Sequence, residues 1–121
     1  VDEIIATGDI KNNNIILYDD ILDTGWTFCK TVEEIALHQS QSIIWMITHP
    51  LLKKDALEKL ETIDKSGKLK KLYVTNSVYH ESLPDYIEVI DTSTLFAHII
   101  ADIENPENYE WINYNNNTSI L

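Results

Sequence analysis

The stretch IILYDDILDTGWTFCK, residues 15–30, combines a strand pattern, an acidic loop and the beginning of a helix pattern. Residues 15–18 form a continuous apolar run, as in strands that are buried on both faces. The polar residues that follow are three aspartates and a short loop with hydroxyl groups and glycine: Asp19, Asp20, Asp23, Thr24, Gly25 and Thr27. Over residues 27–38, apolar side chains recur at helical spacing. The stretch therefore predicts a strand, a loop and a helix in succession.

The rest of the chain repeats this alternation of patterns. The expected further strands cover residues 4–5, 42–48, 72–75 and 86–90. Helical spacing predicts a helix over 55–63 and a last helix that Thr92 or Ser93 caps and Pro106 ends. We expect the last helix to bury its apolar side chains: Leu95, Phe96, Ile99, Ile100 and Ile103. This order predicts an α/β fold, a mainly parallel sheet with helices on both faces.

Composition indicates one acidic domain of 121 residues with a net charge of -11. Such a surface repels nucleic acids and anionic membranes, so we expect neither as a partner. Every basic residue is a lysine, so no guanidinium is available for bidentate binding of phosphate. The single cysteine, Cys29, cannot form an internal disulfide, which suits the cytoplasm. No run approaches the roughly 20 apolar residues of a membrane helix.

The ends of the sequence suggest how it is organised. It begins with Val1, and its single methionine is Met46, so we expect a fragment of a longer chain. We expect one domain over residues 1–105 and an asparagine-rich tail over residues 106–121.

The acidic loop combines groups that suit a sugar phosphate. Ligands of open parallel sheets bind beyond the carboxyl ends of the strands, where we expect Asp19 and Asp20. The following helix presents free N–H groups and a partial positive charge, which suit a phosphate. Carboxylates only accept hydrogen bonds and therefore prefer hydroxyl groups. Ribose 5-phosphate, with a phosphate at one end and a diol at the other, matches both halves.

Paired aspartates after a strand also occur outside sugar-phosphate sites. Alone, such a pair is most often a solvated loop, and phosphorylation-receiver domains place two aspartates there to hold a metal. A receiver domain needs another aspartate at the end of a later strand, where this chain has Thr48, His49 and Pro50. The ordered set of strand, Asp-Asp, Asp-Thr-Gly-x-Thr and helix is far more specific than the pair alone.

The segment IILYDDILDTGWT resembles the ribose-phosphate binding motif of the type I phosphoribosyltransferase fold, which is Rossmann-like. More narrowly, the chain resembles the C-terminal domain of ribose-phosphate pyrophosphokinase, also called phosphoribosyl pyrophosphate synthetase. Further similarities are GDIKNNN before the motif, Cys29 after it, THP at 48–50, VTNS at 74–77 and LFAHII at 95–100. The resemblance covers roughly residues 5–105.

The resemblance implies an enzyme that transfers pyrophosphate from ATP to O1 of ribose 5-phosphate with Mg²⁺. It implies that Asp19, Asp20 and Asp23 face the ribose hydroxyls, and that Asp19 and Asp20 reach the metal through water. It also implies a loop that wraps the 5-phosphate: Thr24, Gly25, Trp26 and Thr27. In this family most of the ATP site belongs to the preceding half of the chain, so we expect this stretch alone to be inactive. Oligomers of identical or homologous subunits are the implied assembly.

Two departures from the family pattern concern the site. Trp26 stands where the family has glycine, and a positive φ there would cost on the order of 1–2 kcal/mol. With a negative φ its N–H can still bind phosphate while the indole points away. Lys53 and Lys54 replace a Ser-Gly segment, and we expect them to be solvated.

Two alternative functions stay open. One is a non-catalytic, associated subunit that keeps the fold and binds a catalytic homologue; Trp26 favours it and the three aspartates oppose it. The other is a base-salvage phosphoribosyltransferase, which would share the motif but not THP or VTNS.

Other candidate residues have weaker support. His49 lies at an expected strand end and is a candidate near the site. Three other histidines show no spacing typical of zinc ligands: His38, His80 and His98. We expect Cys29 and Trp45 in the core, and Trp111 and Tyr114 at an interface with a partner.

Overall fold

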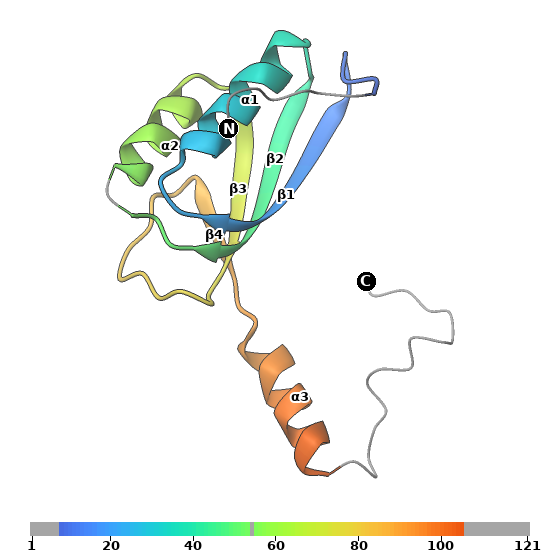
Figure 1. Ribbon diagram of the computed structural model, residues 1–121, viewed down its shortest axis with the longest axis vertical. Helices are drawn as coiled ribbons and strands as arrows, with labels where there is room; N and C mark the ends of the chain where they lie inside the picture. Colours follow the sequence, from blue (N-terminus) through green and yellow to red (C-terminus); the bar gives the residue numbers. More distant parts are fainter. Residues whose placement is uncertain (1–7, 54, 106–121) are drawn as a thin grey trace. The chain divides into compact units, whose positions relative to one another are not determined.

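The computed structural model describes residues 8–53 and 55–105 (Figure 1). The chain divides between Ile90 and Asp91 into two compact units. The first contains a four-stranded sheet and two helices, and the described part of the second contains helix α3 (Ser93–Glu104). No helix in these described ranges is long and apolar enough to cross a membrane.

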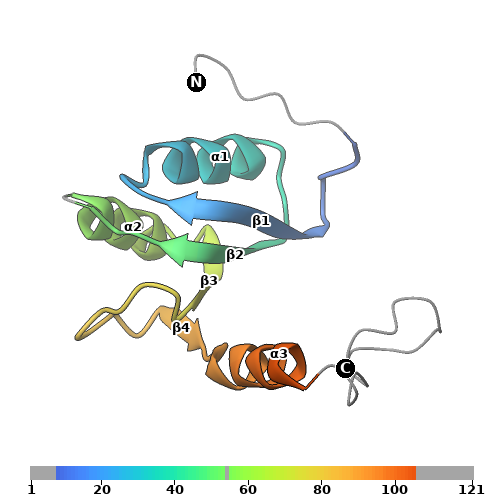
Figure 2. The same ribbon diagram turned by 60° about the horizontal axis from the view of Figure 1, so that its bottom comes forward.

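The sheet of the first unit is parallel throughout. The elements follow in the order β1 (Asn14–Leu22), α1 (Trp26–Leu37), β2 (Ser42–Pro50), α2 (Ala56–Lys65), β3 (Leu69–Thr75) and β4 (Ile87–Ile90). The strands lie in the spatial order β1-β2-β3-β4, and every neighbouring pair is parallel. Figure 2 shows β1 and β2 side by side, with α1 above β1. The predicted α/β class with a mainly parallel sheet is confirmed.

One face of the sheet forms the core with α1 and α2. Alternate residues of β2, namely Ile43, Trp45 and Ile47, are at most 3% exposed, because successive strand residues point to opposite faces. They belong to one buried cluster with the apolar faces of both helices, which contribute Phe28, Val32, Ile35, Leu60 and Ile63. Figure 1 shows α1 and α2 next to each other over the strands.

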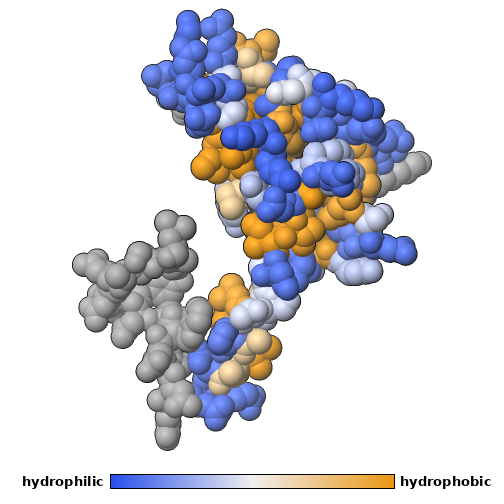
Figure 3. Space-filling model, turned by 180° about the vertical axis from the view of Figure 1, so that it is seen from behind, coloured by the Kyte–Doolittle hydropathy of each residue, from blue (hydrophilic) through white to orange (hydrophobic). Residues whose placement is uncertain are grey.

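The opposite face of the sheet keeps apolar side chains in contact with solvent. Ile16 and Tyr18 of β1 are 68% and 73% exposed, and Met46 and Ile90 are also exposed. Figure 3 shows the first unit from behind, where apolar side chains gather at its surface. Residues 8–53 and 55–90 place no helix on this face. The expected helix on the second face stays a prediction.

Leu57 of α2 is 39% exposed because it lies outside the apolar stripe that Ala56, Leu60 and Ile63 form. Within the second unit, Leu95, Phe96, Ile100 and Ile103 of α3 are exposed and Ile99 is half-buried. The described part of this unit contains no other helix or strand that could cover them, so their expected burial stays a prediction.

Several expectations fall outside the described residues. They are the short strand around Ile4 and Ile5, Lys54, Pro106, the tail, and the interface residues Trp111 and Tyr114. The boundary between a domain and a tail at residue 105 stays a prediction.

Candidate functional site

The candidate site lies where β1 ends and α1 begins. Pairing with β2 continues through Ile21 and Leu22, so Asp19 and Asp20 lie inside β1 and not after it. The strand predicted from the apolar run was too short, because backbone pairing near the end of a sheet does not require apolar side chains. Asp19 is half-buried and Asp20 is exposed.

The two aspartates of β1 differ in direction. Successive strand residues point to opposite faces, so Asp19 shares the helix-covered face with its β2 neighbour Ile47. The Asp19 carboxylate also accepts a 2.9 Å hydrogen bond from the backbone N–H of Asp20. Asp20 itself points to the opposite face of the sheet. Its predicted contact with a ligand stays a prediction.

A cavity of about 100 Å³ lies between the end of β1 and the first turn of α1. Every predicted sugar-phosphate residue except Asp20 lines it: Asp19, Asp23, Thr24, Gly25, Trp26 and Thr27. Apolar side chains complete its lining: Ile21, Leu22, Phe28, Trp45 and Ile47. The fold therefore brings carboxylates, hydroxyl groups and a helix N-terminus to one small cavity.

Gly25 determines how the loop enters α1. It is buried and has a φ of 72°, a left-handed conformation that costs little only for glycine. Its carbonyl oxygen accepts the hydrogen bond of the Cys29 N–H at 3.0 Å, which starts the helix. The first N–H groups of a helix have no intrahelical partner and carry partial positive charge. This turn can therefore bind an anion.

The segment before α2 holds the loop in place. The backbone N–H of Lys53 donates to the Asp23 carbonyl oxygen at 2.9 Å, and that of Leu52 donates to the Leu22 carbonyl oxygen at 3.0 Å. The amino group of Lys53 lies 3.1 Å from Asp23 Oδ2. Lys53 is 64% exposed, so it is solvated as expected, and the fold also places it beside a carboxylate 30 positions away.

Lys59 of α2 is a second cation at the loop, and the sequence pattern did not single it out. Its Nζ atom donates a 2.9 Å hydrogen bond to the Thr24 carbonyl oxygen. Its position on α2 becomes relevant only because α1 and α2 are neighbours in the fold. No sequence signal distinguishes it from the other lysines.

Trp26 is the first residue of α1, and its φ is not positive. The glycine-like conformation belongs to Gly25, so Trp26 carries no penalty of left-handed backbone. Its side chain is 55% exposed, and the Lys30 amino group lies 4.8 Å from its ring centroid. The indole thus contacts a half-buried lysine one helical turn away.

The inner wall of the cavity is aromatic. Phe28 and Trp45 stack with ring centroids 4.4 Å apart, and both are at most 3% exposed. Trp45 is packed in the sheet as predicted, but its place in the cavity wall was not foreseen. Two buried atoms have no hydrogen-bond partner among the described residues, Trp45 Nε1 and Asp23 Oδ1.

Cys29 packs against the core from the first turns of α1 and is half-buried. Burial raises the pKa of its thiol, the Glu33 carboxylate acts in the same direction, and the Lys59 amino group opposes both. The neutral thiol is therefore favoured, which agrees with the predicted place of Cys29 in the core.

The motifs THP and VTNS meet at the carboxyl ends of β2 and β3. Ser77 Oγ and Thr75 Oγ1 donate hydrogen bonds to the Thr48 carbonyl oxygen at 2.8 and 2.6 Å. Ser77 Oγ also lies 2.9 Å from His49 Nδ1. His49 is exposed and engaged in this network, and it does not line the cavity. A direct contact of His49 with a ligand stays a prediction.

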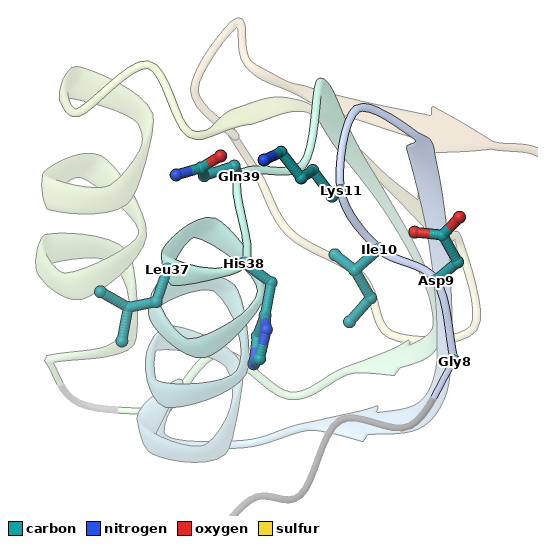
Figure 4. Close-up of a pocket in the computed structure, with 7 residues that line it drawn as sticks. All are labelled: Gly8, Asp9, Ile10, Lys11, Leu37, His38 and Gln39. Atoms are coloured by element: carbon teal, nitrogen blue, oxygen red, sulfur yellow. The ribbon is translucent and has the colours of Figure 1, made fainter.

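A larger, open cavity of about 330 Å³ lies at the other end of α1 (Figure 4). Its lining consists of Gly8, Asp9, Ile10, Lys11, Leu37, His38 and Gln39. His38 pairs with Glu34 one helical turn away at 3.2 Å. This cavity lies at the amino end of β1 and has no helix N-terminus, so the smaller cavity is the stronger candidate for a ligand site.

Comparison with known proteins identifies the family. The family model of the phosphoribosyl synthetase-associated domain matches residues 3–113. The chain belongs to this family. Its fold is similar to the crystal structure of phosphoribosylpyrophosphate synthetase from Mycobacterium smegmatis, with a TM-score of 0.72 and 24% identity. That similarity covers 83% of this chain and 33% of the other.

Curated relatives of the phosphoribosyl synthetase-associated domain support the same assignment. The chain is 35% identical over 107 residues to ribose-phosphate pyrophosphokinase 5 of Schizosaccharomyces pombe, covering 86% of this chain and 30% of the relative. It is 30% identical over 96 residues to the ribose-phosphate pyrophosphokinase of Thermotoga maritima, covering 79% and 29%. The chain thus spans less than a third of the length of these relatives. The resemblance to this family is confirmed.

Proposed function

We propose that this domain is the ribose 5-phosphate-binding half of a ribose-phosphate pyrophosphokinase. Such an enzyme transfers pyrophosphate from ATP to O1 of ribose 5-phosphate. The observation that carries the proposal is the cavity that joins the carboxylates of Asp19 and Asp23 to the first turn of α1. The carboxylates accept hydrogen bonds from sugar hydroxyls, and the helix N-terminus binds the phosphate.

The charges around the loop favour a phosphate at the helix end of the cavity. Lys53 and Lys59 contact the loop through Asp23 and the Thr24 carbonyl oxygen. They bring positive charge to one place on a chain whose net charge is -11. Local cations raise the concentration of an anionic ligand at such a site. The left-handed conformation of Gly25 lets the loop turn into α1 around that ligand.

The donor chemistry of this edge fits Mg²⁺ in its hydrated form. Mg²⁺ keeps several waters and binds through one or two carboxylates together with substrate phosphates. Among the described residues no group of three or more His, Cys, Asp or Glu could hold a metal ion directly. Asp19 lines the cavity and would hold the hydrated ion through water, whereas Asp20 lies on the opposite face of β1 and its water-mediated contact with the metal stays a prediction. Bound Mg²⁺ would neutralise charge that develops on the transferred group. ATP is the proposed co-substrate, and the cytoplasm is the proposed compartment.

Calorimetric titration with ribose 5-phosphate and Mg²⁺ tests the proposal. We expect the parent chain to bind and Asp19→Asn to bind more weakly, because the amide loses the charge that attracts hydroxyl donors. Asp85→Asn, an exposed aspartate outside the cavity lining, is the matched control. Asp20→Asn shows whether the carboxylate on the other face contributes. Binding that appears only after Trp26→Gly would contradict the proposal, since it would mean that the tryptophan closes the site.

A non-catalytic, associated subunit is the second candidate. Trp26 favours it, because a large side chain stands at the phosphate loop where the resemblance implies glycine. Such a subunit would assemble with a catalytic homologue. Binding of ribose 5-phosphate distinguishes the two candidates, because this stretch alone is expected to be inactive under both. If the chain changes the activity or assembly of a catalytic relative but binds no ribose 5-phosphate, the second candidate replaces the first.

A further inference from the structure

We infer that Trp45 is a ligand-binding residue whose indole N–H donates a hydrogen bond to a hydroxyl group of the sugar phosphate. Asp23 Oδ1 accepts a hydrogen bond from the same hydroxyl. This inference rests on the proposed function and extends it to a residue outside the loop. Two observations lead to it: both atoms are buried, and neither has a hydrogen-bond partner among the described residues.

The two unpaired atoms belong to residues that line the same cavity, and they differ in character. An indole N–H can only donate, and an ionised carboxylate can only accept. A buried polar group that is left unpaired is destabilising, so a ligand that pairs both atoms gains from both. A hydroxyl both donates and accepts. A phosphate oxygen would pair with Trp45 but be repelled by Asp23, so a sugar hydroxyl fits this end of the cavity better.

The cavity of about 100 Å³ leaves room for a ligand group between these two residues.

The surroundings hold both atoms in position. The Trp45 ring stacks on Phe28, and β2 pairs its backbone with Leu17 and Leu72 on either side. The Asp23 carboxylate is held through Oδ2 by Lys53, which leaves Oδ1 for the ligand. A donor and an acceptor that are fixed before binding lose little entropy when the ligand arrives.

Trp45→Phe in the full chain tests the inference, because phenylalanine keeps an aromatic ring on Phe28 and removes the N–H. We expect the affinity for ribose 5-phosphate to fall about three- to tenfold, which corresponds to one net hydrogen bond. We expect the 2-deoxy or the 3-deoxy analogue to bind the parent more weakly than ribose 5-phosphate by a similar factor. In Trp45→Phe the difference in affinity between ribose 5-phosphate and that analogue should shrink. The variant lacks the indole N–H and the analogue lacks the hydroxyl, and both belong to the same hydrogen bond. Tyr79→Phe, on a side chain that is 84% exposed, is the matched control.

The outcomes separate failure of the proposed function from failure of the inference about Trp45. If the parent does not bind ribose 5-phosphate, the proposed function fails and this inference with it. This inference alone fails if the parent and Trp45→Phe bind ribose 5-phosphate equally well. It also fails if removing the hydroxyl from the ligand weakens binding by the same factor in both proteins. If Trp45→Phe does not fold, the NMR resonance of the Trp45 indole N–H in the parent provides the test instead. A downfield shift on addition of ribose 5-phosphate supports the inference, and an unchanged resonance overturns it.

Discussion

The amino group of Lys53 lies 3.1 Å from Asp23 Oδ2, across 30 positions of the sequence. The side chains are 64% and 39% exposed, so solvent screens this ion pair. The adjacent backbone hydrogen bond between the same two residues, at 2.9 Å, does not depend on the lysine side chain. The ion pair therefore orients the carboxylate of Asp23, and the backbone bond positions the loop.

Lys53→Ala should change the free energy of unfolding by less than about 1 kcal/mol, as expected for an exposed ion pair. Denaturant unfolding at low and at high salt measures it. The difference from the parent should decrease at high salt, because salt screens exposed charges. Lys70→Ala, at an exposed lysine of β3, is the control. A loss of several kcal/mol in Lys53→Ala would show that the side chain supports the loop itself.

Gly25→Ala and Gly67→Ala should destabilise the protein by similar amounts, about 1–2 kcal/mol each, because both glycines are left-handed. A Cβ at Gly25 would lie 3.6 Å from the Ala56 carbonyl oxygen, an ordinary contact, and a Cβ at Gly67 would meet nothing within 4 Å. Thermal unfolding compares the two variants. Titration with ribose 5-phosphate should separate them, since only Gly25 lines the cavity. Equal affinities would contradict the proposed role of the loop.

Phe28→Ala and Trp26→Ala should differ strongly in stability although the residues are two positions apart. Phe28 is 2% exposed and stacks on Trp45, so its truncation should cost about 3–5 kcal/mol. Trp26 is 55% exposed and contacts Lys30, which predicts a cost below about 1 kcal/mol. Denaturant unfolding of both variants provides the comparison. A large loss in Trp26→Ala would mean that its indole packs against the protein.

Cys29→Ala should make the decline of stability in alkaline solution less steep. Burial raises the pKa of the thiol above its value of 9.0 in the unfolded chain. The unfolded chain therefore loses its thiol proton first. The stabilisation is fully present below the unfolded pKa and is lost as pH rises through the folded pKa. Unfolding free energies across this pH range, for parent and variant, measure the effect. Parallel curves would show that the thiol is as accessible in the folded state as in the unfolded chain.

Ser77→Ala should destabilise the protein by about 0.5–1.5 kcal/mol, because Ser77 Oγ bonds the Thr48 carbonyl oxygen and His49 Nδ1. Ser82→Ala, at an exposed serine outside this network, is the control. Thermal unfolding distinguishes them. Equal melting temperatures would mean that the contact between the THP and VTNS motifs contributes nothing to stability.

The local patterns of the sequence were sufficient for the order of strands and helices and for most of the core. Apolar runs and helical spacing located β1, α1, β2 and α2 within a few residues, because burial of one face imposes a fixed period. Gly67 follows the end of α2 with a φ of 69°. The least accurate boundary was the end of β1, where the strand continues through Asp19 and Asp20. Side-chain polarity does not report where backbone pairing stops.

The sequence by itself determined the chemistry of the loop, because the residues of 19–27 are neighbours along the chain and all of them except Asp20 line the cavity. Only the tertiary structure decided which distant groups join them. Lys53, Lys59 and Trp45 reach the loop from 35 or fewer positions away through the register of β1 with β2 and the packing of α1 beside α2. A lysine or tryptophan has the same local pattern whether it faces solvent, core or ligand. Its role becomes fixed when parallel pairing and helix packing bring separate segments to one cavity.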